Sequence, residues 1–194
     1  MTRGSAVLAA ALVFLVGTSH AQAQGFLFDD SRDIMGGGPN FFSRGGASPI
    51  PRTTVSYPAN YAPGTIVINT TERRLYLIEP GGTALSYGIG VGRDGFRWSG
   101  VHRISAKKEW PGWTPPAEMR RRRPDLPVHM AGGIDNPLGA RAIYLGSTLY
   151  RIHGSNEPET IGQAVSSGCF RMTNEDVADL YGRVSIGATV IVKN

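Results

Sequence analysis

The chain has 194 residues, enough for one domain of ordinary size with short additional segments. Apolar residues make up 41% of it, so a packed core is possible, while 26 glycines and 13 prolines argue against long helices and favour strands, turns and loops. The one dense basic run, Arg120-Arg121-Arg122-Arg123, is interpreted as a solvated loop. No nucleic-acid partner is expected, because no aromatic ladder accompanies these arginines and the N-terminus carries an export signal.

The export signal occupies residues 1–23. Arg3 supplies a positive start, residues 6–16 form an uncharged apolar run, and Ala21-Gln22-Ala23 offers small residues where a signal peptidase cleaves. A run of eleven residues is too short to span about 30 Å of bilayer as a helix. Cleavage removes Arg3 and no acid, which lowers the formal net charge from +5 to +4. We expect an exported, periplasmic or envelope protein without a transmembrane segment; an uncleaved anchor is the alternative.

A flexible linker is predicted over residues 24–60. Gly36-Gly37-Gly38-Pro39 and Ser48-Pro49-Ile50-Pro51 are typical of a segment that buries little surface. The remaining residues, 61–194, are expected to form a single folded domain.

Short β-rich runs dominate this domain, and residues 65–69 and 74–78 read as a hairpin. Further strands are expected at 85–92, 101–106, 142–145, 149–153 and 189–192. One convincing helix covers 174–181, with Thr173 or Asn174 as its cap and an apolar stripe at Val177, Leu180 and Tyr181. The fold class is therefore mostly β, a sandwich or barrel-like domain with one or two short helices.

The segment from Lys107 to Gly139 shows little regular pattern. It contains Trp110 and Trp113 among several prolines, which argues for an ordered loop. A loop of this length inside a domain either covers an open face of the sheet or forms a wall of a substrate cleft, and both interpretations stay open.

The chemistry is concentrated in His153-Gly154-Ser155 and Ser166-Ser167-Gly168-Cys169-Phe170-Arg171. Cys169 is the only cysteine, so it forms no internal disulfide and is a candidate reactive thiol. A thiol becomes a good nucleophile when a base takes its proton, and a histidine can do this and later protonate a leaving amine. The connection between His153 and Cys169 is long enough to bring them together.

The turn before Cys169 and the arginine after it complete the site. A tight turn at Ser166-Ser167-Gly168 can direct the N–H groups of Gly168 and Cys169 outward as an oxyanion hole. Arg171 is expected to hold a substrate carboxylate or carbonyl, or to lower the pKa of the thiol; an ordinary surface arginine is the alternative.

These residues closely resemble the L,D-transpeptidases with a YkuD-type catalytic domain. In that family a His-Gly pair precedes, by sixteen positions, a cysteine in a Ser-X-Gly-Cys-aliphatic-Arg/Asn context, and His153 and Cys169 are sixteen apart. The resemblance extends from about Pro63 to Val192. Two departures are Ser167, where many members have histidine, and Phe170, where many have Ile or Val.

The resemblance implies a role for each matching residue. Cys169 is the nucleophile, His153 the general base and acid, and the backbone carbonyl of Gly154 orients the imidazole. The N–H groups of Gly168 and Cys169 hold the oxyanion, while Arg171, Ser167, Trp110 and Trp113 are candidates for substrate binding.

The implied substrates are the peptide stems of peptidoglycan, both as donor and as acceptor. Attack on a tetrapeptide stem releases D-Ala and leaves an acyl-enzyme, which an amine resolves to a 3→3 crosslink. No metal or organic cofactor is needed.

Three alternatives remain. Water or an envelope protein's amine can resolve the acyl-enzyme, which would make the protein a carboxypeptidase or a tethering transferase. A wall-binding module without turnover would need neither Cys169 nor His153. A metal site built from His102, His129 and His153 is disfavoured, because these histidines have no paired spacing.

Overall fold

The computed structural model describes Met1, residues 48–58 and residues 60–194. The predicted signal peptide, apart from Met1, and most of the predicted linker lie outside the described residues. The last part of that linker belongs to the sheet: β1 (Thr53–Ser56) pairs antiparallel with β4 (Thr83–Gly88). Backbone hydrogen bonds to β4 explain why a segment of linker-like composition is ordered here.

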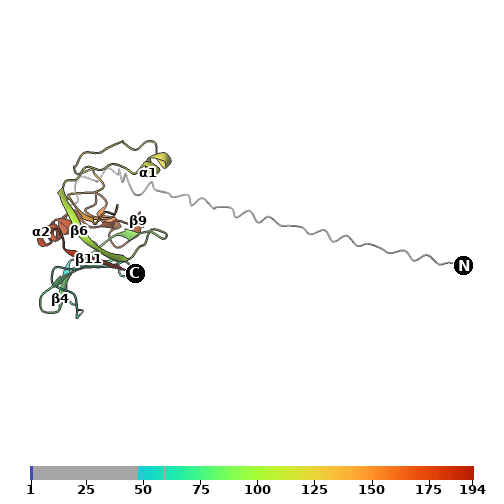
Figure 1. Ribbon diagram of the computed structural model, residues 1–194. Coiled ribbons are helices and arrows are strands. Elements are labelled where there is room, and N and C mark those ends of the chain that lie inside the picture. The colour runs from blue at the N-terminus through green and yellow to red at the C-terminus, as the bar shows by residue number, and fades with distance from the viewer. Residues whose placement is uncertain (2–47, 59) are drawn as a thin grey trace.

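The domain is mostly β, as the sequence predicts (Figure 1). Within the described residues, nine strands form one sheet in the order β1-β4-β3-β2-β11-β6-β7-β8-β10, and β5 pairs with β9 in a separate two-stranded sheet. The remaining strands are β2 (Ile66–Asn69), β3 (Arg74–Glu79), β5 (Val91–Gly92), β6 (Gly100–Glu109), β7 (Arg141–Leu145), β8 (Arg151–His153), β9 (Ala164–Ser166), β10 (Phe170–Arg171) and β11 (Thr189–Lys193).

The predicted hairpin is present as β2 and β3, with Asn69 opposite Arg74 at its closed end. Ile66, Val67 and Ile68 are all fully buried, so β2 is covered on both faces. Ile66 and Ile68 join the main core, whereas Val67 packs on the other side with Ile78 and Ala84.

The long strand β6 passes from one half of the large sheet to the other. Its first residues, Gly100 to Arg103, pair with β11, and its later residues pair with β7. The register shifts between Ile104 and Ala106, where a bulge lets the strand bend. The sheet therefore curls around the main core instead of lying flat.

The predicted C-terminal helix is α2 (Asn174–Arg183). Its cap is Thr173, whose side-chain oxygen accepts a hydrogen bond from the Asp176 N–H at 3.1 Å. Val177 and Leu180 enter the main core, and the helix packs against β7 and β8. A 3-10 turn, η3 (Pro158–Thr160), lies between β8 and β9. Within the described ranges, no helix is long and apolar enough to cross a membrane.

The long loop forms a small unit of its own, here called the 110–140 loop. The Trp110 N–H donates to the Ala140 carbonyl at 2.8 Å and joins its two ends. Trp113, Leu126 and Leu138 form a separate apolar cluster inside it. The arginine run predicted as loop lies largely in a short helix, α1 (Ala117–Arg122), which Figure 1 shows at the far end of the molecule from β4. Its arginines stay at least partly exposed.

Candidate active site

The predicted histidine and cysteine lie on two short neighbouring segments of the sheet. β8 and β10 run parallel, with Ile152 paired to Phe170 and His153 paired to Arg171. Ile152 and Phe170 are buried in the main core, and their strand neighbours point to the opposite face. Cys169 directly precedes β10 and is therefore level with Arg151. The His153 carbonyl also accepts a hydrogen bond from the Met172 N–H at 2.8 Å, which keeps the two segments in register.

The imidazole of His153 is held by the backbone carbonyl of the next residue, Gly154. The side chain is only 5% exposed, and its Nδ1 lies 2.6 Å from the Gly154 carbonyl oxygen. With Nδ1–H donating to that oxygen, Nε2 is the nitrogen that remains to accept a proton. Burial, assisted by the positive charge of Arg171, lowers the pKa of His153 from 6.5 to about 3, against a smaller opposing effect of the Gly154 hydrogen bond.

The thiol of Cys169 is partly buried and lies within the electrostatic influence of two arginines. Its Sγ is 3.9 Å from the Leu149 carbonyl oxygen. Burial raises the pKa of Cys169, and the positive charges of Arg151 and Arg171 oppose this only in part. Both shifts favour the uncharged forms, a neutral thiol at Cys169 and a neutral imidazole at His153.

The turn before Cys169 is stabilised by the side chain of Ser166. Its Oγ accepts from the Gly168 N–H at 3.2 Å and donates to the Cys169 carbonyl at 2.6 Å. The Gly168 N–H is thus already engaged, contrary to the expected pair of oxyanion donors. The Cys169 N–H has no protein acceptor within residues 48–58 and 60–194, so it is the donor that the turn leaves available.

Arg171 differs from its expected role as a substrate clamp. Its guanidinium nitrogen lies 2.8 Å from Glu157 Oε2, and the two side chains are 8% and 5% exposed. An arginine engaged this way holds the segment after β8 against β10. Glu157 was not recognised from the sequence, because only the fold brings it to Arg171.

The two tryptophans of the 110–140 loop have different environments. Trp113 is 7% exposed and packs within the loop's own apolar cluster, which leaves little of its side chain available to a substrate. Trp110 is 46% exposed and remains a candidate contact for substrate. Ser167 is half-buried in the turn before the thiol.

The alternative metal site finds no support in the geometry. His102 stacks edge-on against Trp98, and His129 is hydrogen-bonded to Thr114 at 3.0 Å, whereas His153 bonds Gly154. In the part of the chain that the structure describes, no three His, Cys, Asp or Glu side chains gather as metal ligands.

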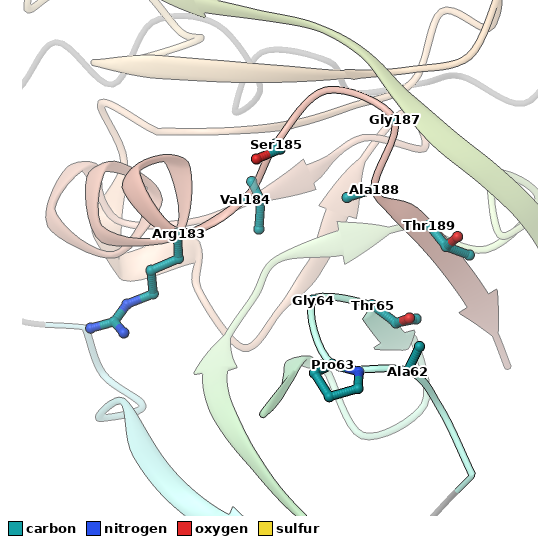
Figure 2. Close-up of a pocket in the computed structure, with 10 residues that line it drawn as sticks. All are labelled: Ala62, Pro63, Gly64, Thr65, Arg183, Val184, Ser185, Gly187, Ala188 and Thr189. Atoms are coloured by element: carbon teal, nitrogen blue, oxygen red, sulfur yellow. The ribbon is translucent and has the colours of Figure 1, made fainter. Parts of the chain in front are cut away.

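A surface hollow of about 300 Å³ lies away from this site. Figure 2 shows its lining, formed by residues 62–65 before β2 and by residues 183–185 and 187–189, from the end of α2 to the start of β11. Neither His153 nor Cys169 borders it, so the chemistry is not located there.

A histidine fixed by a carbonyl, beside a cysteine on the adjoining segment, is the side-chain set of a cysteine–histidine site, a class suited to nucleophilic acyl chemistry. The family model described as YkuD, L,D-transpeptidase catalytic domain, matches residues 63–192. The chain therefore belongs to the L,D-transpeptidase family with the YkuD catalytic domain.

Individual relatives agree with this assignment. "Probable L,D-transpeptidase ErfK/SrfK" of Escherichia coli K12 is 40% identical over 134 residues, which cover 64% of this chain and 42% of that protein. The match thus spans less than half of that relative. L,D-transpeptidase 3 of Mycobacterium tuberculosis shares the fold, with a TM-score of 0.54 at 17% identity, covering 67% of this chain and 60% of that one.

A third similar protein has a different description. A crystal structure of a "Probable carnitine operon oxidoreductase caia" from Brucella melitensis is 44% identical, covers 80% of this chain and 99% of that chain, and has a TM-score of 0.52. That description is of the Brucella protein.

Proposed function

We propose that this chain is an exported cysteine L,D-transpeptidase that acts on the tetrapeptide stems of peptidoglycan. The observation that carries the proposal is the parallel register of β8 and β10, which sets His153 and Cys169 on adjoining segments. The L,D-transpeptidase function is preferred to the oxidoreductase description, because the matched family region, 63–192, contains both residues.

The first half of the reaction is acylation. His153 Nε2 takes the thiol proton as the Cys169 sulfur attacks the carbonyl at the L-centre of diaminopimelate. The C–N bond to D-Ala then breaks, the imidazolium returns the proton to the leaving amine, and a thioester remains on Cys169. Burial favours the uncharged thiol and imidazole, which supports proton transfer during the attack.

The second half transfers the acyl group. An amine of a second stem, deprotonated by His153, attacks the thioester carbonyl, and the thiol is regenerated with its proton. The product is a 3→3 crosslink. The energy comes from the peptide bond that was broken, so no nucleotide is required. Water or an amine of an envelope protein are the alternative acceptors.

Intact-mass spectrometry with purified disaccharide-tetrapeptide tests this mechanism. We expect a thioester adduct, release of D-Ala and a crosslinked dimer, and no adduct on Cys169→Ala. His153→Ala should lose orders of magnitude in acylation rate, whereas His129→Ala, which removes an exposed histidine of the 110–140 loop, should behave as wild type. Adduct formation on Cys169→Ala would overturn the mechanism. D-Ala release with tripeptide as the only product would indicate water as acceptor.

Export is tested separately by the mass of the protein recovered from the periplasm. A mature chain that begins at Gln24 is expected. Recovery of the full-length chain in a membrane fraction would favour the uncleaved anchor.

A further inference from the structure

Trp98 contacts the turn that carries the nucleophile. It lies between β5 and β6, and its indole Nε1–H donates to the Gly168 carbonyl oxygen at 2.8 Å. This bond spans 70 positions of sequence. It is made to the peptide group that joins Gly168 to Cys169, whose other end is the Cys169 N–H.

The ring of Trp98 is fixed by three aromatic neighbours. It stacks on Tyr150 with centroids 4.4 Å apart and planes 13° apart, and it contacts Phe170 at 5.4 Å. His102 meets it edge-on at 5.2 Å. A ring held on several sides keeps its N–H in one direction, so the hydrogen bond to Gly168 is preorganised.

The turn itself fits closely against this stack. Gly168 has a φ of +108°, and a Cβ at this position would lie 2.6 Å from Tyr150 Cε1. No larger residue fits between Tyr150 and the nucleophile. The turn is therefore held by the Tyr150 and Trp98 rings on one side and by the Ser166 hydroxyl within it.

A planar trans peptide points its carbonyl and its N–H in opposite directions. Since Trp98 holds the Gly168 oxygen, the Cys169 N–H must point away from Trp98, and a flip of this peptide would break the indole hydrogen bond. The Gly168 N–H is already bonded to Ser166 Oγ. The Cys169 N–H is therefore the backbone donor of this turn that remains available to an oxyanion.

We propose that Trp98 is a positioning residue that fixes the direction of the Cys169 N–H as an oxyanion donor. The inference deepens the proposed function and rests on acyl chemistry at Cys169. Trp98 touches neither the reacting atoms nor His153 in this scheme; it acts through one peptide group.

The test compares two reactions at the same sulfur. Acylation by p-nitrophenyl acetate passes through a tetrahedral oxyanion, whereas alkylation by iodoacetamide is a displacement at carbon and builds none. Both rates are followed by intact mass, with Cys169→Ala as the background. We expect Trp98→Phe, which keeps a ring but loses the N–H, to slow acylation about 10- to 100-fold. Alkylation should stay within about twofold of wild type, as a displacement needs no oxyanion donor.

Two further variants guard against a purely structural effect. Benzothienylalanine at position 98 preserves the ring shape and lacks the N–H, and it should repeat the loss of acylation. His129→Ala removes an exposed histidine that is hydrogen-bonded to Thr114 and makes no ring contact with Trp98, and it should keep both rates. Unchanged acylation in Trp98→Phe, or an equal loss in both reactions, would overturn the inference. Because the ester is a generic acyl donor, this result is independent of whether tetrapeptide is the substrate.

Discussion

Arg171 on β10 and Glu157, just after β8, form a buried ion pair with a nitrogen–oxygen distance of 2.8 Å. Each residue is close in sequence to one member of the candidate catalytic pair: Arg171 follows Cys169 by two residues, and Glu157 follows His153 by four. The pair therefore connects the segments that carry the nucleophile and the base.

Removal of Glu157 should destabilise the fold strongly. Glu157→Ala breaks the buried ion pair with Arg171, and removing one partner of such a pair typically costs about 3–5 kcal/mol in the free energy of unfolding. Urea denaturation measures this value. The matched control is Glu118→Ala, which breaks the exposed pair with Arg121 and should cost under about 1 kcal/mol. Equal losses in the two variants would contradict the assigned role of the buried pair.

Gly168→Ala should impair both stability and acylation. An alanine at a φ of +108° is strained, and its Cβ would clash with Tyr150. We expect a cost of about 1–3 kcal/mol in the free energy of unfolding together with a loss of acylation by p-nitrophenyl acetate of at least about tenfold.

Two other glycines serve as controls that separate the effect of backbone strain from the effect of a steric clash. Gly64 has a φ of +85° with open space around it, and Gly182 lies in α2 with nothing near its Cβ position. Gly64→Ala should lose stability but not acylation rate, and Gly182→Ala should lose neither. Gly168→Ala with normal acylation would show that the turn tolerates a side chain.

The buried imidazole should make stability depend on pH. In the folded protein the pKa of His153 is about 3, against 6.5 ordinarily, so between these values the unfolded chain binds a proton there that the folded protein does not. The stability that His153 contributes is present above pH 6.5 and is lost as pH falls towards 3. Each pH unit in this window changes the free energy of unfolding by about 1.4 kcal/mol.

A comparison with His153→Asn isolates this contribution. Between pH 7 and pH 4.5 the free energy of unfolding of wild type should fall by about 2–3 kcal/mol more than that of the variant. Parallel curves for the two proteins in this range would show that the folded protein also protonates His153.

The positive charge of Arg151 should lower the pKa of the Cys169 thiol. Burial raises the pKa of Cys169, and Arg151 supplies the largest opposing effect. Arg151→Gln should therefore move the pH midpoint of iodoacetamide alkylation upwards and slow the reaction at pH 8. Arg74→Gln, on β3, serves as the control and should leave the profile unchanged. A downward shift in Arg151→Gln would reverse the assigned sign.

Local patterns accounted for much of the fold. The hairpin of β2 and β3 and the helix α2 were predicted because their signals are local: β-rich runs around a polar turn, and a capping Thr173 before an apolar stripe. β1 was missed, since its residues become a strand only by pairing with β4.

The sequence by itself determined which residues form the candidate site, because the spacing and context of His153 and Cys169 are read directly along the chain. Only the tertiary structure decided how they are held. Trp98 reaches Gly168 across 70 positions, and Glu157 neutralises an arginine expected to face substrate. Such contacts depend on the curl of the sheet and on the register of β8 with β10, and neither leaves a periodic signal in the residues concerned.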